Sequence, residues 1–305
     1  MNLTDKIVNL IRETSSSLPD DVLAALKRAQ RREAKGSSAA VVLKTILDNC
    51  AIAKRRGTPL CQDTGTLTFF VDERLRRKVT PEVIRRAVAV ATEKGYLRKN
   101  TIDSVTGRSF DDNVADGAPV VHYVGSDSVG LGSDRVGLGS DGVGLGSGRT
   151  GLKGLKRPYV TLIMKGGGSE NMSRQYSLPD AALGAGRDLA GVRKCVLDAV
   201  QKIQGYGCAP GILGVTIGGD RATGYEVAKE QLLRPLGEAA PSPLLKKLER
   251  RLLKEANSLG IGPMGLGGKT TLLGVKAAAR PRVPASFFVT IAYMCWACRR
   301  RTVEI

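Results

Sequence analysis

Residues 59–66 read Pro-Leu-Cys-Gln-Asp-Thr-Gly-Thr, and a strand-like run, Leu-Thr-Phe-Phe-Val, follows at 67–71. Proline and glycine flank the segment, which predicts a turn that delivers Cys61 to the start of a strand. A thiolate is a soft metal ligand, and the amide of Gln62 and the carboxylate of Asp63 can hold a polar substrate beside it. The segment therefore predicts a candidate metal ligand beside substrate-binding groups, in a turn that precedes a strand.

Two later cysteines stand in comparable settings, in Gly-Cys-Ala-Pro at 207–210 and Cys-Trp-Ala-Cys at 295–298. Three separated cysteines without a fourth partner suit a [4Fe–4S] cluster with one open iron, because purely redox clusters normally use four. An open iron is a Lewis acid that binds carboxylate and hydroxyl groups and weakens a C–O bond toward loss of water. We therefore predict that Cys61, Cys208 and Cys295 converge on one [4Fe–4S] cluster.

The other cysteines and the single histidine are interpreted as structural. The pair at 295–298 has thioredoxin spacing, but no βαβ start precedes it and no second Cys-x-x-Cys completes a zinc site, so one member is expected to be a bystander. Cys50 and Cys195 lie inside helical patterns and are expected to be small buried hydrophobic residues. His122 is the only histidine in the sequence, so a His-rich metal site is excluded, and His122 is interpreted as a strand residue.

The composition is that of a globular protein of one or two domains, with 305 residues of which 42% are hydrophobic. The sequence has no signal-peptide pattern at its start and no run of membrane-spanning length, so we expect a cytoplasmic location. A formal net charge of +18 favours an anionic substrate or an acidic partner. No basic–aromatic motif accompanies the charge, so nucleic acid is the less favoured partner.

The order of patterns predicts an α/β mixed (α+β) fold, with a helical N-terminal subdomain at 1–57 and a cluster-binding core at 58–305. Two helix starts within the first segment are marked by Pro19-Asp20-Asp21 and by Ser37-Ser38. Further helices are expected at about 80–94, 186–204, 222–234 and 242–258. Strands are expected at 66–72, 120–124, 158–164, 211–217 and 287–293, around one sheet.

Residues 125–152 differ in kind, because a Gly-Ser-Asp-Ser-Val-Gly-Leu unit recurs there every seven residues. Glycine costs a helix about 1 kcal/mol per residue, so this is no coiled-coil heptad. We interpret it as a surface insertion that arose by tandem duplication, since calcium-binding glycine–aspartate repeats have nine-residue units. Without the insertion, strands 120–124 and 158–164 are close in sequence and are predicted to pair as a hairpin.

Two glycine-rich loops resemble anion sites. Gly-Gly-Lys-Thr at 267–270 lacks the glycine that a phosphate loop requires five positions before its Gly-Lys pair, because Pro263 stands there. The run Gly166, Gly167 and Gly168 could expose a row of backbone amides to an anion, although a tight turn explains it equally well.

Five motifs in order resemble the class I fumarate hydratase and L(+)-tartrate dehydratase family, and specifically its alpha chain. The motifs are Pro-Leu-Cys-Gln-Asp-Thr-Gly (59–65), Lys-Gly-Gly-Gly-Ser-Glu-Asn (165–171), Gly-Cys-Ala-Pro-Gly-Ile-Leu-Gly-Val-Thr-Ile-Gly-Gly (207–219), Gly-Ile-Gly-Pro-Met-Gly-Leu-Gly-Gly-Lys-Thr-Thr (260–271) and Cys-Trp-Ala (295–297). The resemblance covers nearly the whole chain apart from the repeat insertion.

The resemblance implies that Cys61, Cys208 and Cys295 are the ligands of the [4Fe–4S] cluster. It implies that Gln62 and Asp63 contact the substrate, with Asp63 handling protons on the departing hydroxyl. The implied reaction is the reversible hydration of fumarate to (S)-malate. Dehydration of L(+)-tartrate to oxaloacetate is the alternative, since the two substrates differ by one hydroxyl group.

Other family features imply how the substrate is held. Arg98 matches an arginine that grips a carboxylate, a task that suits its two-pronged guanidinium. Gly166, Gly167 and Gly168 match glycines that line the substrate. Members also complete the site with a second region, fused or supplied as a beta subunit, so we expect a hetero-oligomer.

One departure from the family stands at Val283, in Arg-Val-Pro-Ala-Ser at 282–286, where a histidine is usual. The change removes a polar group expected near the cluster. It keeps open a second alternative, a cluster-binding protein with impaired catalysis.

Overall fold

The computed structural model describes residues 2–125 and 157–305, so the repeat insertion predicted at 125–152 lies almost wholly outside the described residues. The α-helices are α1 (Leu3–Ser16), α2 (Asp20–Arg32), α3 (Ser38–Arg56), α4 (Pro81–Glu93), α5 (Gly167–Asn171), α6 (Leu189–Ile203), α7 (Arg221–Gln231) and α8 (Pro243–Ser258). The strands are β1 (Thr66–Asp72), β2 (Thr101–Ile102), β3 (Ser109–Phe110), β4 (Val120–Val124), β5 (Tyr159–Lys165), β6 (Arg174–Ser177), β7 (Gly211–Gly218), β8 (Leu272–Arg280), β9 (Phe288–Met294) and β10 (Arg299–Glu304). Mixed α and β structure confirms the predicted fold class.

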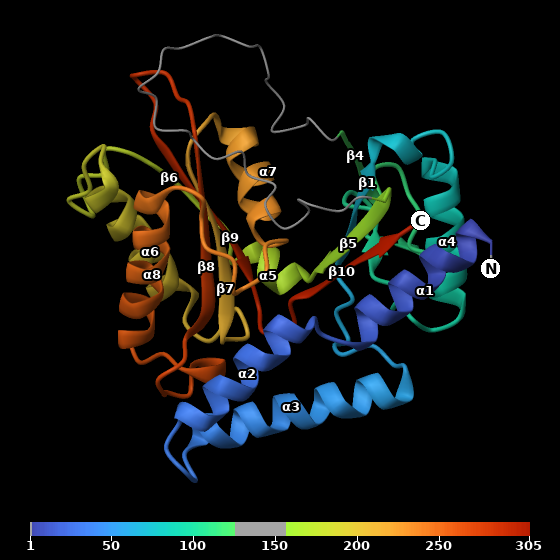
Figure 1. The fold of residues 1–305 in the computed structure, drawn as a ribbon, viewed down its shortest axis with the longest axis horizontal. Helices are drawn as coiled ribbons and strands as arrows, with labels where there is room; N and C mark the ends of the chain where they lie inside the picture. Colours follow the sequence, from blue (N-terminus) through green and yellow to red (C-terminus); the bar gives the residue numbers. More distant parts are fainter. Residues whose placement is uncertain (1, 126–156) are drawn as a thin grey trace.

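The described strands form two four-stranded sheets and a small β2–β3 hairpin. The first sheet has the order β10-β5-β1-β4, in which β4 is parallel to β1 and the other pairs are antiparallel. The second has the order β6-β9-β7-β8, in which only β7 and β8 are parallel. In Figure 1 the two sheets lie side by side, with the short helix α5 between them.

The predicted hairpin of 120–124 with 158–164 is wrong, because β1 lies between these two strands and pairs with both. The buried strand β1 has neighbours on each side, while β4 is half-exposed and forms the edge. The prediction of a single sheet is also wrong. Strands β8 and β10, rich in alanine and arginine, were not predicted and contribute one strand to each sheet.

The N-terminal helices begin where capping residues predict. The Ser37 side chain accepts a hydrogen bond from the backbone N–H of Ala40, and Thr80 precedes the proline that starts α4. The helix α1 packs on α4 and on strands β5 and β10 of the first sheet, while α2 contacts β8 of the second. Below the sheets, α2 and α3 lie side by side (Figure 1).

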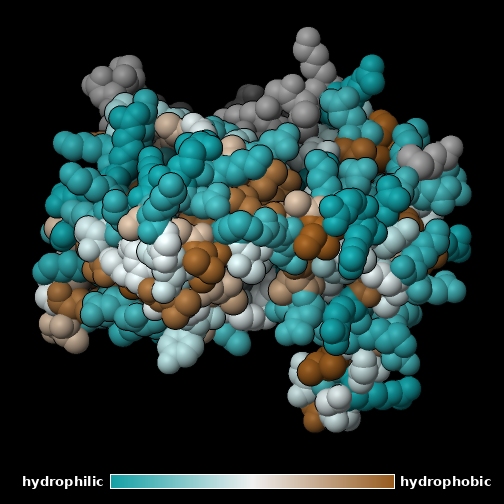
Figure 2. Space-filling view, turned by 90° about the horizontal axis from the view of Figure 1, so that it is seen from below, coloured by the Kyte–Doolittle hydropathy of each residue, from teal (hydrophilic) through white to brown (hydrophobic). Residues whose placement is uncertain are grey.

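One hydrophobic cluster joins these helices to both sheets. It contains Leu26 and Leu43 from the helices, Phe70 of the first sheet, and Ile212 and Met294 of the second. Burial of these apolar groups, at roughly 25 cal/mol per Å², holds the two sheets in a fixed relation. The face seen from below is mainly hydrophilic with hydrophobic patches between charged side chains (Figure 2).

Candidate functional site

The three predicted thiol ligands lie where the chain passes between the two sheets. Cys61 precedes β1 of the first sheet, whereas Cys208 precedes β7 and Cys295 follows β9 of the second. Residues 166–173 carry the chain from β5 to β6, and residues 295–298 carry it back from β9 to β10. The two crossing segments touch, because the Cys295 N–H donates to Ser169 Oγ at 3.1 Å.

Backbone hydrogen bonds hold the Cys208 turn against the Cys295 turn. The Trp296 N–H donates to the Cys208 carbonyl at 3.3 Å, and the Cys208 N–H donates to the Gly205 carbonyl at 3.1 Å. Cys208 has φ of 53°, a left-handed conformation that costs a non-glycine residue of order 1–3 kcal/mol. Such a conformation persists only when surrounding contacts impose it.

Electrostatics ties Cys61 and Asp63 to the other two thiols. Burial raises the pKa of the Cys208 thiol, and the negative charges of Cys295 and Cys61 raise it further. The carboxylate of Asp63 adds to the same effect. Cys61, Cys295 and Asp63 therefore each lie within electrostatic range of Cys208.

Exposure divides the six cysteines into two sets. Cys208 is exposed and Cys61 and Cys295 are half-buried, while Cys50, Cys195 and Cys298 are buried. Burial raises the pKa of each thiol in the second set to about 11. These three are poor thiolates at neutral pH, which agrees with their interpretation as structural residues.

Asp63 is held through both its side chain and its backbone. Its Oδ2 accepts a hydrogen bond from the Gly167 N–H at 2.8 Å, and its carbonyl accepts one from Arg299 Nη2 at 2.8 Å. A Cβ on Gly166 would lie 2.7 Å from Oδ2, so glycine is needed there for the carboxylate to approach. The predicted glycine run thus contacts the predicted acid.

Arg98 and Gln62 lie next to this acid. The Arg98 N–H donates to Thr64 Oγ1 at 3.3 Å, and the Arg98 carbonyl accepts from Asn113 Nδ2 at 2.7 Å, which places its backbone beside the residue after Asp63. Both Arg98 and Gln62 are exposed, so their side chains are open to a ligand from solvent.

Several residues near the site were not predicted. Ser169 and Glu170 stand within the motif at 165–171, but the sequence assigned neither of them a role. In the structure Ser169 contacts the Cys295 backbone and Glu170 pairs with Lys165. Burial lowers the pKa of Lys165 to about 8, with Glu170 opposing the shift. Arg299 is 1% exposed, yet a run of three arginines predicts a solvent-facing surface.

The arrangement of the three thiols is not that of a site for a single metal ion. Within residues 2–125 and 157–305, no three His, Cys, Asp or Glu side chains converge tightly enough for one ion. A four-iron cluster offers each thiolate its own iron, so the sulfurs need not converge on a point. The one histidine, His122, stacks on Phe70 with ring centroids 5.2 Å apart on the first sheet.

A buried hydroxyl beside two of the thiols supports the same fit. Tyr293 is 1% exposed, and its Oη has no hydrogen-bond partner among the described residues. Burial and the charges of Cys295 and Cys208 raise its pKa well above the usual value. A buried donor close to the thiols is suited to face an anionic cluster.

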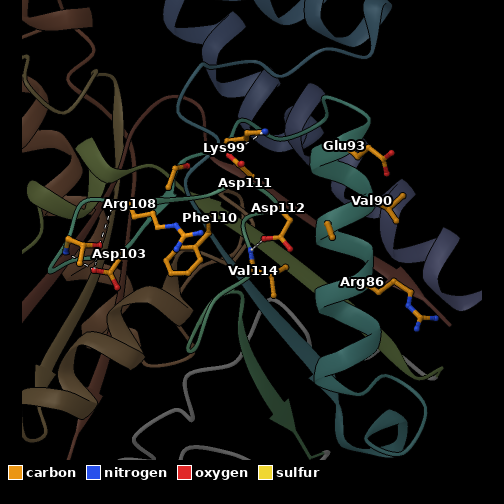
Figure 3. A pocket seen from close by; sticks show the side chains of 13 residues that line it. Arg86, Val90, Glu93, Lys99, Asp103, Arg108, Phe110, Asp111, Asp112 and Val114 are labelled. Atoms are coloured by element: carbon orange, nitrogen blue, oxygen red, sulfur yellow. Dashed lines mark hydrogen bonds and ion pairs between the residues drawn. The ribbon is translucent and has the colours of Figure 1, made fainter.

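A wide hollow in the described part of the chain lies apart from this site. It measures about 1060 Å³ and lies between α4 and residues 99–114, as Figure 3 shows. Its lining includes Arg86, Glu93 and Asp111, and it contains none of the predicted site residues. A smaller cavity of about 230 Å³ lies between the first sheet and α7.

Val283 lies far from the thiols of its own chain. It is 65% exposed in the loop from β8 to β9, at the strand ends where Gly218 pairs with Arg280, whereas Cys295 adjoins the opposite end of β9. A seven-residue strand at about 3.3 Å per residue separates the two by roughly 20 Å. The expectation that position 283 lies near the cluster is therefore wrong within one chain.

None of the helices described has the length and apolar character needed to cross a membrane.

Comparisons with known proteins match almost the full chain. The profile of the family described as Fumarate hydratase (Fumerase) matches residues 4–145 and 150–304. A Geobacillus stearothermophilus protein provisionally named class I fumarate hydratase is 44% identical over 99% of this chain, and the match covers 55% of that protein. The chain thus spans about half the length of this relative.

Two relatives of similar length carry another name. A Methanocaldococcus jannaschii protein provisionally named L(+)-tartrate dehydratase subunit alpha is 32% identical over 100% of this chain and 98% of its own length. The L(+)-tartrate dehydratase subunit alpha of Escherichia coli K12 is 29% identical over 99% of this chain and 90% of its own. With both the family profile and these relatives matched along its length, the chain belongs to the fumarate hydratase (Fumerase) family, which includes the alpha subunits of L(+)-tartrate dehydratase.

Proposed function

We propose that this chain is the cluster-bearing alpha part of a class I fumarate hydratase, which interconverts fumarate and (S)-malate. The observation that supports this most directly is that three accessible thiols gather beside Asp63 at the junction of the two sheets. The identity of 44% with a relative provisionally named class I fumarate hydratase favours this substrate.

Cys61, Cys208 and Cys295 would hold a [4Fe–4S] cluster. When bound, the cluster supplies a Lewis acid that polarises the hydroxyl group to be lost or added. Three thiol ligands would leave one iron of such a cluster without a protein ligand. Cys208 is exposed to solvent.

The chain's own residues bind and orient the substrate. Arg98 grips one carboxylate through its guanidinium fork, and Gln62 contacts the polar groups beside it. Asp63 handles the proton on the departing hydroxyl, because its carboxylate is held at a fixed place by the Gly167 N–H. Gly167 and Gly168 are exposed, so their backbone lines the substrate without a side chain in the way.

A second region completes the site in this proposal. The Geobacillus relative is nearly twice as long as the match, and the Escherichia coli relative is named as an alpha subunit. We therefore propose a beta subunit or equivalent region as the partner, in a hetero-oligomer.

L(+)-tartrate dehydratase is the second candidate, because the relatives matched over at least 90% of their length carry that name. Assays of the chain combined with its partner region, on fumarate, (S)-malate and L(+)-tartrate, distinguish the two. Turnover of tartrate alone would replace the first proposal by the second.

The cluster itself is tested by anaerobic reconstitution and analysis of iron and sulfide, repeated with alanine at each of the six cysteines. We expect loss of the cluster at positions 61, 208 and 295 only, and loss of activity on exposure to air. Equal loss at Cys298 would contradict the ligand assignment. Normal iron content without turnover of any of the three substrates would favour a cluster-binding protein with impaired catalysis.

A further inference from the structure

Three charged side chains form a continuous chain of ion pairs close to the thiols. Lys165, the last residue of β5, is 4% exposed and its Nζ lies 2.8 Å from Glu170 Oε2. The other carboxylate oxygen, Oε1, lies 2.8 Å from Nζ of Lys229. We call Lys165, Glu170 and Lys229 the clamp.

The clamp connects elements that belong to different sheets. Lys165 ends a strand of the first sheet, Glu170 lies on α5, and Lys229 lies on α7, which packs on β7 and β9 of the second sheet. The three side chains line the cavity of about 230 Å³ between the first sheet and α7. The polar groups in that lining also include Thr66, Thr68, His122, Thr223, Tyr225, Glu226, Glu230 and Arg280.

The helix held by the clamp makes two contacts with the candidate site. At its start, the Gly167 N–H donates to Asp63 Oδ2 at 2.8 Å. Two residues later, Ser169 Oγ accepts a hydrogen bond from the Cys295 N–H at 3.1 Å. A shift of α5 would therefore move the carboxylate and the thiol backbone together.

Lys165 also acts on α5 through a serine. Its Nζ donates to Ser173 Oγ at 3.2 Å, and that hydroxyl donates to the Ser169 carbonyl at 3.2 Å. The Tyr293 N–H donates to the same Ser173 Oγ at 3.2 Å. The buried ammonium group of Lys165 thus holds α5 in two ways. It pairs with the Glu170 side chain, and through Ser173 it is linked to the Ser169 backbone carbonyl.

We infer that Lys165 is a positioning residue, which through Glu170 and Ser173 sets Asp63 and Cys295 relative to each other. The inference rests on the proposed function, since it assumes that Asp63 and Cys295 act in one site. The alternative is that the clamp has a purely structural role and only stabilises the fold.

A matched control for that alternative is Lys276. It is 3% exposed on β8, and its Nζ donates to the carbonyl of Leu236 at 2.8 Å and to that of Glu238. It is therefore a second buried, hydrogen-bonded lysine, and its two acceptors lie outside α5 and outside the candidate site. Lys276→Met therefore measures how the removal of a buried lysine affects the fold, without a direct effect on the candidate site.

The first measurement compares kcat and KM of Lys165→Met, Lys165→Arg and Lys276→Met in the complete enzyme. We expect Lys165→Met to lower kcat about 10- to 100-fold with KM changed less than about threefold, because a displaced catalytic group costs turnover more than binding. Lys165→Arg should recover most of kcat. Lys276→Met should leave kcat within about twofold of the unmodified enzyme, even if its thermal stability falls as far as that of Lys165→Met.

The second measurement needs no activity. In the apo chain, the alkylation rates of Cys295 and Cys208 by iodoacetamide are followed by mass spectrometry. We expect Lys165→Met to change the ratio of the two rates at least about threefold by releasing the Cys295 turn, and Lys276→Met to leave it unchanged.

Equal effects of Lys165→Met and Lys276→Met on both measurements would overturn the inference. Absence of hydratase or dehydratase turnover in the unmodified enzyme, with a changed alkylation ratio in Lys165→Met, would instead reject the proposed function and keep the positioning role.

Discussion

Asp63 is the residue whose chemistry can be tested most directly. It contacts Gly167 and Arg299 through hydrogen bonds, and neither contact requires it to bind iron. We expect Asp63→Asn to lower kcat by about 10²- to 10⁴-fold, the usual contribution of a proton-transferring group, with iron and sulfide content unchanged. Asp111→Asn, at an exposed aspartate paired with Lys99, is the control for a simple change of charge. Loss of iron in Asp63→Asn would show that the carboxylate supports the cluster instead.

Tyr293 allows a second test at the scale of one atom. Its buried Oη lacks a partner among the described residues, and an unpaired buried hydroxyl costs free energy that its removal recovers. We expect Tyr293→Phe to raise the free energy of unfolding of the apo chain by about 1 kcal/mol, measured by urea denaturation. A free energy of unfolding below that of the unmodified chain would mean that the hydroxyl already has a partner, such as a bound water.

Sequence reasoning proposed three thiol ligands but not the residues that contact their segments. Cys61 and Cys208 were recognisable because glycine and proline place them in turns, and Cys295 because it follows a predicted strand. Arg299 was not, because burial of an arginine depends on a carbonyl acceptor 236 positions away in the chain, and local patterns carry no trace of such a contact.

At the scale of elements, α8 depends on one buried ion pair. Glu249 Oε1 lies 2.7 Å from Arg234 Nη1, and the same carboxylate accepts hydrogen bonds from the N–H groups of Ala277 and Ala240. We expect Glu249→Ala to lower the free energy of unfolding by about 3–5 kcal/mol, because it removes the buried counter-charge of the guanidinium and leaves only the more exposed Glu238, at 3.6 Å.

The matched control lies on the same helix. Glu255 pairs with Arg193 and Arg251 at the surface, and Glu255→Ala should cost no more than about 1 kcal/mol. Thermal or urea denaturation of the two variants checks both values. Similar losses in the two variants would contradict the special role of the buried pair.

The helices were predicted more accurately than the sheets. Helix starts are set by local capping residues, and Ser37 and Thr80 lie where those signals place them. Strand partners are set by contacts distant in sequence, so neither the position of β1 between β4 and β5 nor the division into two sheets followed from the patterns. The boundary of the N-terminal subdomain at residue 57 stays a prediction.

At the scale of the whole molecule, three buried thiols set an alkaline limit to stability. The pKa of Cys50, Cys195 and Cys298 is about 11 in the folded chain against 9.0 for an ordinary thiol, so the unfolded chain loses these protons first. Their contribution is complete below pH 9 and declines as pH rises toward 11, by up to about 1.4 kcal/mol per pH unit for each thiol. Burial lowers the pKa of Lys165 and Lys276 to about 8, against 10.5 for an ordinary lysine. Their contribution to the free energy of unfolding therefore rises with pH between 8 and 10.5, opposite to that of the thiols.

A difference measurement isolates one thiol from these opposing groups. We expect the stability advantage of the unmodified chain over Cys298→Ala to shrink as pH rises from 9 to 11, in urea denaturation at a fixed salt concentration. A constant difference across that range would show that Cys298 titrates alike in the folded and unfolded chain.

The origin of the thiols in two different sheets has a consequence for synthesis. Cys61 enters the site from the first sheet and Cys295 from the second, and 234 positions separate them. A nascent polypeptide on the ribosome cannot assemble the proposed ligand set until residue 295 has been translated. Binding of iron and sulfide by the proposed ligand set therefore requires that both sheets have been synthesised and have come together.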